Sequence, residues 1–350
     1  MNAASSSSPS SVETSMIPAL SATAIGIDIG GTKINAALVE PGLRGYDNVL
    51  GDTAPPSLMN VPTPTDPTVF LETLASMINT LATGQPVAAV GISTAGVVDS
   101  INGRILGSTG NMPALRTLSN LRELLEQRIQ LPIHIENDAN AAAYGEWRCG
   151  AAIGATNMFA ITLGTGVGMG IVFNNALYRG SHFYAGEGGH IAIDYHRKRQ
   201  CTCGRWDCWE AFASGKGLQT TAERNVSAAS ESLRQEFLET YCQDNIITTY
   251  AVIAAKKAGH RIGIQVLDDW HHHIAVGLGS LINVMDPDMI VVGGGLAQFV
   301  DFDLLTERTR ERTMSNAFRL VPAKLGNYAG IVGAACLASE NSLTHKTAAS

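Results

Sequence analysis

Three cysteines and one histidine are spaced closely enough in the sequence to share a metal ion. Cys201, Cys203 and Cys208 form a C-x-C-x4-C run, and His190 stands eleven residues before the first of them. Four such ligands complete the tetrahedral shell of a structural zinc ion and leave no open position. A disulfide is disfavoured because Cys201 and Cys203 are too close to bridge easily, and a C-x-x-C redox motif is absent. The spacing predicts structural zinc in a loop over residues 190–208.

Two glycine-rich corners could approach an anion closely. The first, "DIGGTK", supplies Asp28, Gly30, Gly31, Thr32 and Lys33. Successive backbone N–H groups form a concave anion site, and Mg²⁺ between a phosphate and a carboxylate such as Asp28 would be a natural partner. A plain hairpin turn explains the same residues. The second corner, "LGTGVG", supplies Gly164, Thr165 and Gly166 and favours the phosphate interpretation. Strands flank both corners, so neither is a P-loop or a dinucleotide fingerprint.

The segment "ENDANAAA", residues 136–143, places polar groups between a predicted strand and a predicted helix. The carboxylate of Asp138 could accept a proton from a substrate hydroxyl, and the amide of Asn137 could bind a polyol. The same two residues could simply cap the helix that follows. Residue types alone leave both interpretations open.

The elements that must position these residues recur along the chain. Residues 22–40 and 156–180 are each typical of a strand, a tight glycine corner and a second strand. Helical spacing predicts helices over 66–83, with Asp66 as the N-cap, over 117–129, and through most of 211–282. This weak internal repeat predicts two similar α/β lobes that face each other, with both glycine corners lining the cleft between them.

The domain organisation follows from this repeat and from composition. Residues 1–22 form a Ser-rich segment too poor in apolar residues to build a core, and we expect a disordered tail there. We expect an N-terminal α/β lobe over 23–136, a C-terminal α/β lobe over 137–340, and a second tail over 341–350.

Composition excludes several classes of protein. The 350 residues are 45% hydrophobic and 16% charged, as expected of a globular chain, and the net charge of −7 argues against a nucleic-acid surface. Six cysteines, of which three are clustered, do not resemble the disulfide framework of a secreted protein. No apolar run is long enough for a membrane span, and no signal peptide is evident. We expect a cytoplasmic protein.

Taken together, the motifs carry a resemblance to a known family. "GIDIGGTK", "ENDANAAA", "LGTGVGMGI", "AGEGGHI", "CTCGRWDCWEAFAS" and "VVGGG" occur in the order found in the ROK family of sugar kinases and repressors. They cover most of residues 24–338. The resemblance implies the two-lobed actin/hexokinase-like ATPase fold, in which ATP and sugar meet between the lobes.

The resemblance also implies roles for individual residues. Asp138 resembles the general base that accepts the proton of a sugar 6-hydroxyl. The residues that resemble sugar ligands are Gly96, Asn111, Asn137, Glu187, His190 and Glu210, with His190 also bound to zinc. The residues that resemble the phosphate loops and the adenosine-side turn are Asp28, Gly30, Gly31, Thr32, Lys33, Gly164, Thr165, Gly166, Gly293, Gly294 and Gly295. Asp207 stands where the family usually has a small residue, which could reshape the sugar rim.

The function that the resemblance implies is an ATP-dependent hexose 6-kinase with Mg²⁺ bound to ATP and structural Zn²⁺, in a homodimer. Glucose is the first expected substrate, and N-acetylmannosamine or N-acetylglucosamine is the alternative. Two other classes are a DNA-binding repressor and a non-catalytic sugar-sensing regulator. The repressor is disfavoured because about 22 Ser-rich residues before the first motif are too few for a helix-turn-helix domain. The regulator is disfavoured because Asp138 is present.

Overall fold

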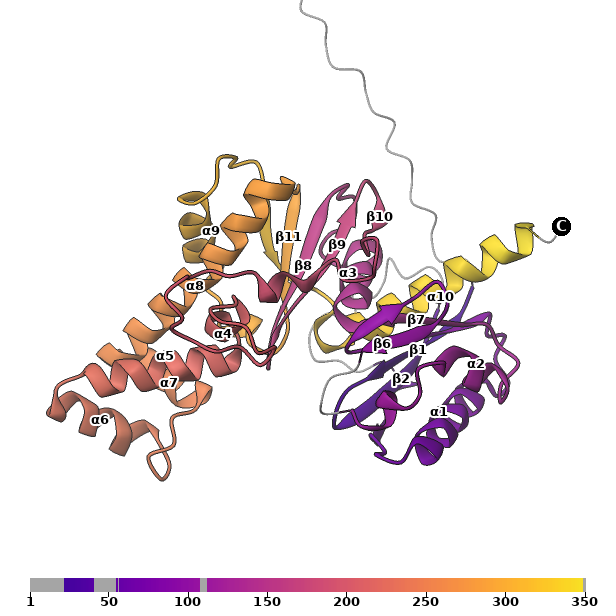
Figure 1. The fold of residues 1–350 in the computed structure, drawn as a ribbon, viewed down its shortest axis with the longest axis horizontal. Helices are drawn as coiled ribbons and strands as arrows, with labels where there is room; N and C mark the ends of the chain where they lie inside the picture. Colours follow the sequence, from indigo (N-terminus) through magenta and orange to yellow (C-terminus); the bar gives the residue numbers. More distant parts are fainter. Residues whose placement is uncertain (1–21, 41–54, 56, 108–111, 349–350) are drawn as a thin grey trace, which may run out of the picture.

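The described chain consists of two α/β lobes, each built on a twisted sheet. A computed structural model describes residues 22–40, 55, 57–107 and 112–348. The strands of the first sheet, in the order β3-β2-β1-β4-β7, are β1 (Ala24–Ile29), β2 (Lys33–Val39), β3 (Met59–Pro62), β4 (Ala89–Thr94) and β7 (Ile133–Asn137). Helices α1 (Pro67–Ala82) and α2 (Leu121–Glu126) cover its outer face (Figure 1). The short strands β5 (Val97–Asp99) and β6 (Arg104–Gly107) pair with each other beside it.

The second sheet repeats the arrangement of the first. Its strands, in the order β10-β9-β8-β11-β12, are β8 (Met158–Leu163), β9 (Val167–Phe173), β10 (Ala176–Leu177), β11 (Met289–Gly293) and β12 (Arg319–Pro322). In both sheets an antiparallel hairpin is followed by parallel strands: β1 pairs with β2 and with β4, and β8 pairs with β9 and with β11. The predicted repeat of two α/β lobes is therefore confirmed. Ligand sites in such sheets form outside the carboxyl ends of the parallel strands, where both glycine corners lie.

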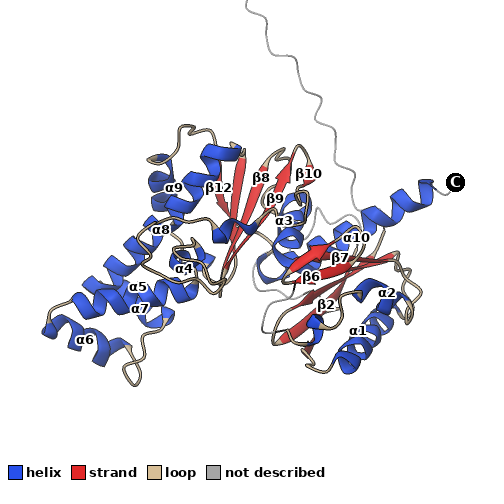
Figure 2. Cartoon of the chain, in the orientation of Figure 1, coloured by secondary structure: helices blue, strands red, loops and turns tan. Residues whose placement is uncertain are grey.

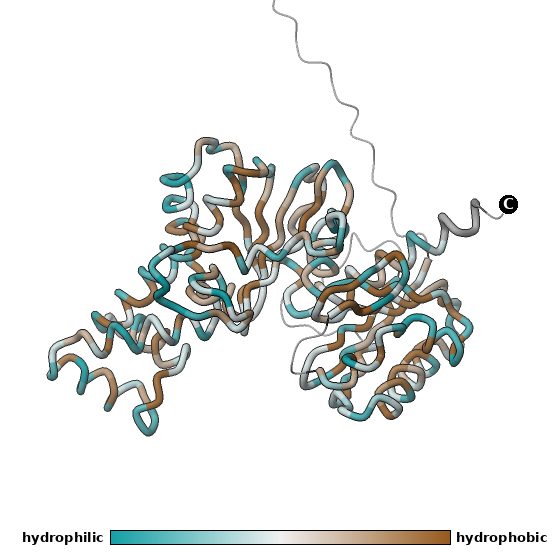
Figure 3. Tube along the Cα trace, in the orientation of Figure 1, coloured by the Kyte–Doolittle hydropathy of each residue, from teal (hydrophilic) through white to brown (hydrophobic). Residues whose placement is uncertain are grey.

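Helices surround the second sheet on its outer side. They are α4 (Glu210–Ala213), α5 (Gly215–Ala228), α6 (Glu231–Tyr241), α7 (Thr249–Lys257), α8 (Arg261–Met285) and α9 (Phe302–Arg310). Figure 2 shows these helices in blue beside the red strands, and Figure 3 shows apolar residues concentrated along the sheets and the inner helix faces. The buried rings of Trp209 and Trp270 anchor this layer, and Trp209 fills the space left by Gly277 on α8. The largely helical character predicted for residues 211–282 is confirmed.

Two predicted helices in the first lobe differ in outcome. Helix α1 begins after Asp66, whose carboxylate accepts hydrogen bonds from the backbone N–H groups of Thr68 and Val69, so the predicted cap is confirmed. Helix α2 is shorter than the predicted range of 117–129. The carbonyl of Ser119 instead accepts a hydrogen bond from the N–H of Ile105 at 2.9 Å, which holds the segment before α2 against β6.

Two helices lie between the sheets. Helix α3 (Asp138–Cys149) follows β7, and α10 (Ala329–Ala348) packs against α3, β1 and β4. Glycine permits this close approach: a Cβ on Gly91 of β4 would lie 1.9 Å from the carbonyl oxygen of Ala334, and one on Gly333 would lie 1.7 Å from that of Ala141. The closing helix therefore joins the second half of the chain to the first sheet.

The structure describes most of the C-terminal segment but almost none of the N-terminal segment. The predicted N-terminal tail lies outside the described residues, apart from Ala22. The prediction of a tail over 341–350 is wrong for residues 341–348, because α10 continues to Ala348. The side chain of Asn341 reaches Nδ1 of His134 on β7 at 3.0 Å, and Ser342 is buried, so packing extends the helix. Within the described residues, no helix is long and apolar enough to cross a membrane.

Candidate functional site

The first glycine corner joins β1 to β2 and leaves polar groups free for a ligand. The N–H of Gly30 donates to the carbonyl of Lys33 at 3.0 Å, which closes the turn. Thr32 and Lys33 are exposed. Behind them on β1, the carboxylate of Asp28 accepts a hydrogen bond from the Ser93 hydroxyl at 2.8 Å. The corner can therefore present backbone N–H groups, a hydroxyl and a carboxylate to the same ligand.

Burial alters the acidity of Asp28. Loss of solvation raises its pKa from 3.8 to about 6, the hydrogen bond from Ser93 opposes the rise, and the negative charge of Asp138 adds to it. Two carboxylates that repel each other in one site favour a cation between them or beside them. This donor set fits Mg²⁺, which is bound through one or two carboxylates together with substrate phosphates.

The second glycine corner is held by other parts of its lobe. Between β8 and β9, the N–H of Gly164 donates to the carbonyl of Gly166 at 3.0 Å, and Thr165 is exposed. The N–H of Gly215, at the start of α5, donates to the carbonyl of Gly164 at 2.8 Å. The carboxylate of Glu210 accepts from the N–H of Val167 at 3.1 Å. The turn is thus fixed from both sides.

Asp138 occupies the first position of α3, directly after β7. The side chain of Asn137 accepts a hydrogen bond from the N–H of Asn140 at 3.1 Å, so Asn137 is the helix cap. The carboxylate of Asp138 accepts from the N–H of Ala139 at 2.8 Å and from the amide of Asn137 at 3.1 Å. The Asp138 side chain still reaches solvent, but the surrounding protein reduces its solvation and raises its pKa, and these hydrogen bonds oppose the rise. A carboxylate with a raised pKa that still reaches solvent is suited to accept a proton.

One cavity brings together residues from three of the predicted groups. It has a volume of about 210 Å³ and is lined by Asp28, Asp138, Gly293 and Gly294, among others. Gly294 has φ +85°, and a Cβ there would lie 2.4 Å from the carbonyl oxygen of Leu163. The predicted base, the predicted Mg²⁺ carboxylate and two glycines of the predicted adenosine-side turn therefore face one space.

The predicted zinc ligands also converge. The ligand atoms of His190, Cys201, Cys203 and Cys208 all lie within 4.8 Å of one another. The Cys203 and Cys208 sulfurs are 3.7 Å apart, and Nδ1 of His190 is 3.7 Å from the Cys201 sulfur. Tetrahedral zinc with Zn–S bonds of about 2.3 Å places its ligand atoms about 3.8 Å apart, so the residues fit this ion.

Position 207 has a backbone requirement that favours a small residue. Asp207 has φ +58°, in the left-handed region that glycine adopts easily and that Asp tolerates. Its side chain is buried, and it accepts a hydrogen bond from the N–H of Arg199 at 2.8 Å. The carboxylate of Asp207 therefore points into the loop, and its effect on the sugar rim stays a prediction.

The zinc cluster is connected to the other predicted sugar ligands. His190 lies on the turn Glu187–His190, and its Nε2 is 3.7 Å from a carboxylate oxygen of Glu187. One ring nitrogen therefore faces the cysteines and the other faces Glu187. Glu210 accepts a hydrogen bond from the Thr202 hydroxyl at 2.9 Å, so it joins the cysteine loop to the second glycine corner.

The remaining predicted ligands lie near Asn137 or outside the described residues. The carbonyl of Gly96 accepts a hydrogen bond from the Asn137 amide at 3.0 Å. Asn111 lies outside the described residues. The sugar-binding roles of these residues stay predictions.

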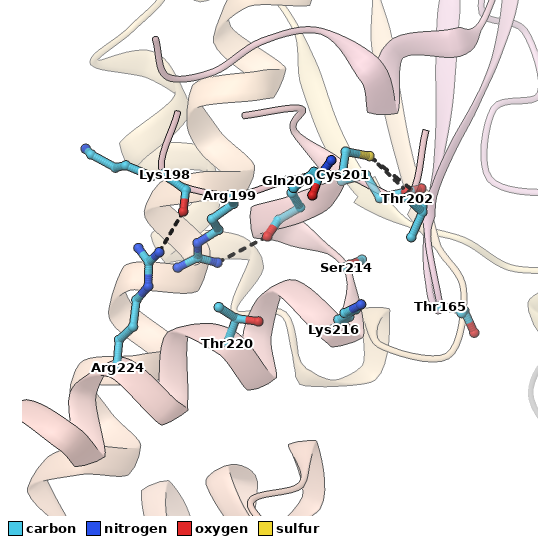
Figure 4. A pocket seen from close by; sticks show the side chains of 12 residues that line it. Thr165, Lys198, Arg199, Gln200, Cys201, Thr202, Ser214, Lys216, Thr220 and Arg224 are labelled. Atoms are coloured by element: carbon cyan, nitrogen blue, oxygen red, sulfur yellow. Dashed lines mark hydrogen bonds between the residues drawn. The ribbon is translucent and has the colours of Figure 1, made fainter. Parts of the chain in front are cut away.

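A basic cavity adjoins the second corner and was missed by sequence reasoning. It has a volume of about 260 Å³, and its lining includes Thr165, Lys198, Arg199, Lys216 and Arg224 (Figure 4). Arg224 donates to the carbonyl of Lys198 at 2.8 Å, which connects α5 to the cysteine loop. The available signal was the basic run at 196–200, together with two cations two helical turns apart on α5.

Comparisons with known proteins show the family of the chain. The model of the ROK family matches residues 24–341. The chain belongs to the ROK family. It is 35% identical over 326 residues to a glucokinase of Streptomyces coelicolor, and the match covers 90% of this chain and 97% of that protein. A xylose repressor of Bacillus subtilis is 26% identical, with 88% of this chain and 75% of the repressor covered.

A solved ROK structure extends the comparison to the fold. The chain is similar to a ROK family glucokinase from Streptomyces griseus in complex with glucose and AMPPNP, with a TM-score of 0.70 and 32% identity. The match covers 91% of this chain and 99% of that one. The predicted actin/hexokinase-like fold is confirmed.

Proposed function

We propose that this ROK protein is an ATP-dependent sugar kinase that phosphorylates the 6-hydroxyl of a hexose, with glucose as its first substrate. The observation that carries the proposal is the cavity shared by Asp28, Asp138, Gly293 and Gly294. Similarity to the Streptomyces glucokinases supports the choice of glucose. We further propose that the enzyme is a cytoplasmic homodimer.

Phosphoryl transfer depends mainly on alignment and on neutralisation of charge. As the sugar oxygen bonds to the γ-phosphorus, the bond from that phosphorus to the β-phosphate oxygen breaks, and the hydroxyl proton passes to Asp138. The N-cap contact of Asn137 holds Asp138 at the start of α3, where its carboxylate can face the hydroxyl. Asp28 would hold Mg²⁺, which neutralises phosphate charge when it is bound with ATP.

The two glycine corners would hold the donor phosphates from opposite lobes. Thr32 and Thr165 are exposed on these turns and can donate hydroxyl hydrogen bonds. Lys216, in the basic cavity beside Thr165, adds a positive charge at the end of the second corner. Sugar contacts would come from Asn137, Glu187, His190 and Glu210. The zinc ion would fix the loop that carries them and take no part in the chemistry.

A coupled assay over a panel of sugars tests this proposal. Purified protein is assayed with Mg²⁺-ATP and glucose, mannose, N-acetylmannosamine or N-acetylglucosamine, and the position of the new phosphate is determined by NMR. We expect the highest kcat/KM with glucose and a 6-phosphate product. A higher kcat/KM with an N-acetylated hexosamine would overturn the choice of glucose, and sugar binding without turnover of any sugar would overturn the assignment as a kinase.

A further inference from the structure

A buried ion pair connects the two lobes next to the proposed base. Glu136 precedes the Asn137–Asp138 pair on β7, and its side chain is 1% exposed. Its Oε2 accepts a hydrogen bond from Nε of Arg179 at 2.7 Å and forms an ion pair with Nη2 of Arg179 at 2.7 Å. Arg179 follows β10 in the second sheet. A charge-assisted hydrogen bond and an ion-pair contact to the same oxygen fix the relative position of the two segments more tightly than a single contact would.

The other oxygen of Glu136 holds the start of α3. Oε1 accepts hydrogen bonds from the N–H of Asn137 and from the side-chain amide of Asn140, both at 3.1 Å. Asn137 in turn donates to the carboxylate of Asp138. Glu136 therefore reaches the proposed base through one intermediate residue, and without touching the cavity that holds Asp138.

The backbone of Arg179 holds the second half of the proposed sugar site. Its carbonyl accepts a hydrogen bond from the N–H of Ala185 at 3.2 Å, just before the turn that carries Glu187 and His190. Gly186 has φ +93°, and a Cβ there would lie 2.4 Å from the Met169 carbonyl oxygen and 3.8 Å from Oδ1 of Asn140. This segment is thus packed closely against β9 and α3.

The charge of Glu136 is maintained despite its burial. Loss of solvation alone would raise its pKa. His134, 3.8 Å away, and Arg179 lower the pKa by more than burial raises it, so it lies below its usual range. A buried carboxylate that stays ionised holds its partners strongly, and removing one partner leaves an uncompensated charge.

We propose that Glu136 and Arg179 are positioning residues that align the proposed base with the sugar. Glu136 fixes Asn137 and Asp138, Arg179 fixes the segment before Glu187 and His190, and their ion pair sets the distance between these two halves of the acceptor site. The inference rests on the proposed kinase function, which it deepens. Neither residue touches the sugar, and both act through their neighbours.

Steady-state kinetics and sugar titration test the proposal. The variants are Glu136→Gln, Arg179→Gln, Arg179→Lys and the double variant Glu136→Gln/Arg179→Gln. We expect each single Gln variant to lower kcat/KM for the sugar by roughly 100-fold, as misplacement by about 1 Å can do, while the KM for ATP stays unchanged. Arg179→Lys should restore part of the loss because it keeps the charge but not the planar fork. The double variant should lose less than the product of the two single losses.

A matched control separates positioning from general stability. Arg148 lies near the other end of α3 and pairs with Glu340 on α10. Arg148→Gln also removes an ion-pairing cation from the helix that begins with Asp138, but we expect it to leave kcat and sugar KM unchanged. If Arg148→Gln lowers sugar turnover as much as Arg179→Gln does, the effect comes from α3 stability and the proposal is wrong.

The remaining outcomes distinguish this proposal from the proposed function. Wild-type sugar kinetics in both single Gln variants, or parallel losses for sugar and ATP, would overturn the positioning role. If a single variant does not fold, the double variant, which keeps two neutral hydrogen-bonding groups, and Arg179→Lys supply the same comparison. If the wild type turns over no sugar, the kinase assignment fails, and calorimetry still decides: weaker sugar binding in Arg179→Gln than in Arg148→Gln would support the ion pair.

Discussion

The two glycine corners have the same topology but differ in the groups that surround them. The corner at Gly30–Thr32 is closed by its own hydrogen bond and lies in front of Asp28, a carboxylate whose pKa burial raises to about 6. The corner at Gly164–Gly166 is also bound by Gly215 and Glu210, and Glu210 contacts the zinc loop through Thr202. Both corners are held by hydrogen bonds from their surroundings, the first from Thr63 and the second from Gly215 and to Glu210, but the first lies in front of an unfavourable buried charge that a cation can relieve. Substitutions at the two corners should therefore separate catalysis from stability.

Asp28→Asn in the first corner should give the largest difference between the effect on activity and the effect on stability. Loss of the proposed Mg²⁺ ligand should lower kcat/KM by roughly 100-fold or more, the range seen when one charge-stabilising group is removed from an active site. Because ionised Asp28 is disfavoured in the folded state, the free energy of unfolding at neutral pH should stay equal or rise. Kinetics and urea denaturation of both proteins check this. A loss of stability that parallels the loss of activity would contradict the claim that the first corner affects catalysis and not stability.

Cys203→Ser in the second lobe should, in contrast, lower stability together with sugar binding. Loss of one zinc ligand should release the metal, lower the melting temperature and raise the sugar KM roughly 10-fold or more, because the loop that carries His190 and Glu210 loosens. Elemental analysis, calorimetric melting and sugar kinetics measure the three effects. Cys242→Ser, which alters a free cysteine after α6, is the matched control and should retain the metal. A purified wild type without zinc would contradict the assignment.

Glu210→Gln tests the connection between the zinc loop and the second corner. The amide keeps the size of the side chain but weakens the hydrogen bonds from the Val167 N–H and the Thr202 hydroxyl. Each bond to a charged acceptor is worth about 1.5–3 kcal/mol, so we expect a severalfold rise in sugar KM with zinc retained. Metal analysis beside the kinetics distinguishes this result from Cys203→Ser. Zinc loss in Glu210→Gln would show that the two regions are not separable.

The smallest effect should be a pH dependence confined to the first corner. Asp28 binds a cation only when ionised, and its pKa lies at about 6, so Mg²⁺ must compete with protons as the pH falls through that value. The Mg²⁺ concentration needed for half-maximal rate should roughly double at the pKa and rise further below it. Mg²⁺ titrations on both sides of pH 6 test this. An Mg²⁺ requirement that is constant with pH would contradict the assigned role of Asp28.

Local signals in the sequence were sufficient for much of the fold and for the metal cluster. Glycine corners between apolar runs mark both hairpins, Asp66 marks the start of α1, and the C-x-C-x4-C spacing predicts a cluster that the structure assembles with His190. These features depend on residues close together in the chain, or on one side chain that favours a particular position, as Asp66 favours the helix N-cap.

The features that the sequence could not predict depend on contacts between distant segments. The C-terminal part of α10 contacts β7 through Asn341 and His134, and a hydrogen bond from Ile105 holds the segment before α2 outside that helix. The Glu136–Arg179 pair joins residues 43 positions apart, and although Glu136 begins the "ENDANAAA" segment, nothing in the sequence marks Arg179 as its partner. The positive φ of Asp207 is likewise set by the fold of the loop and has no signal in the sequence.

The most direct test of the central claim compares the wild type with Asp138→Asn in Mg²⁺-ATP-dependent phosphorylation of glucose. Calorimetry supplies the glucose dissociation constant of each protein. We predict that kcat falls roughly 100- to 10,000-fold, the usual contribution of a general base, while glucose affinity and zinc content stay at wild-type levels. A variant that keeps most of its kcat would contradict the assignment of Asp138 as the base.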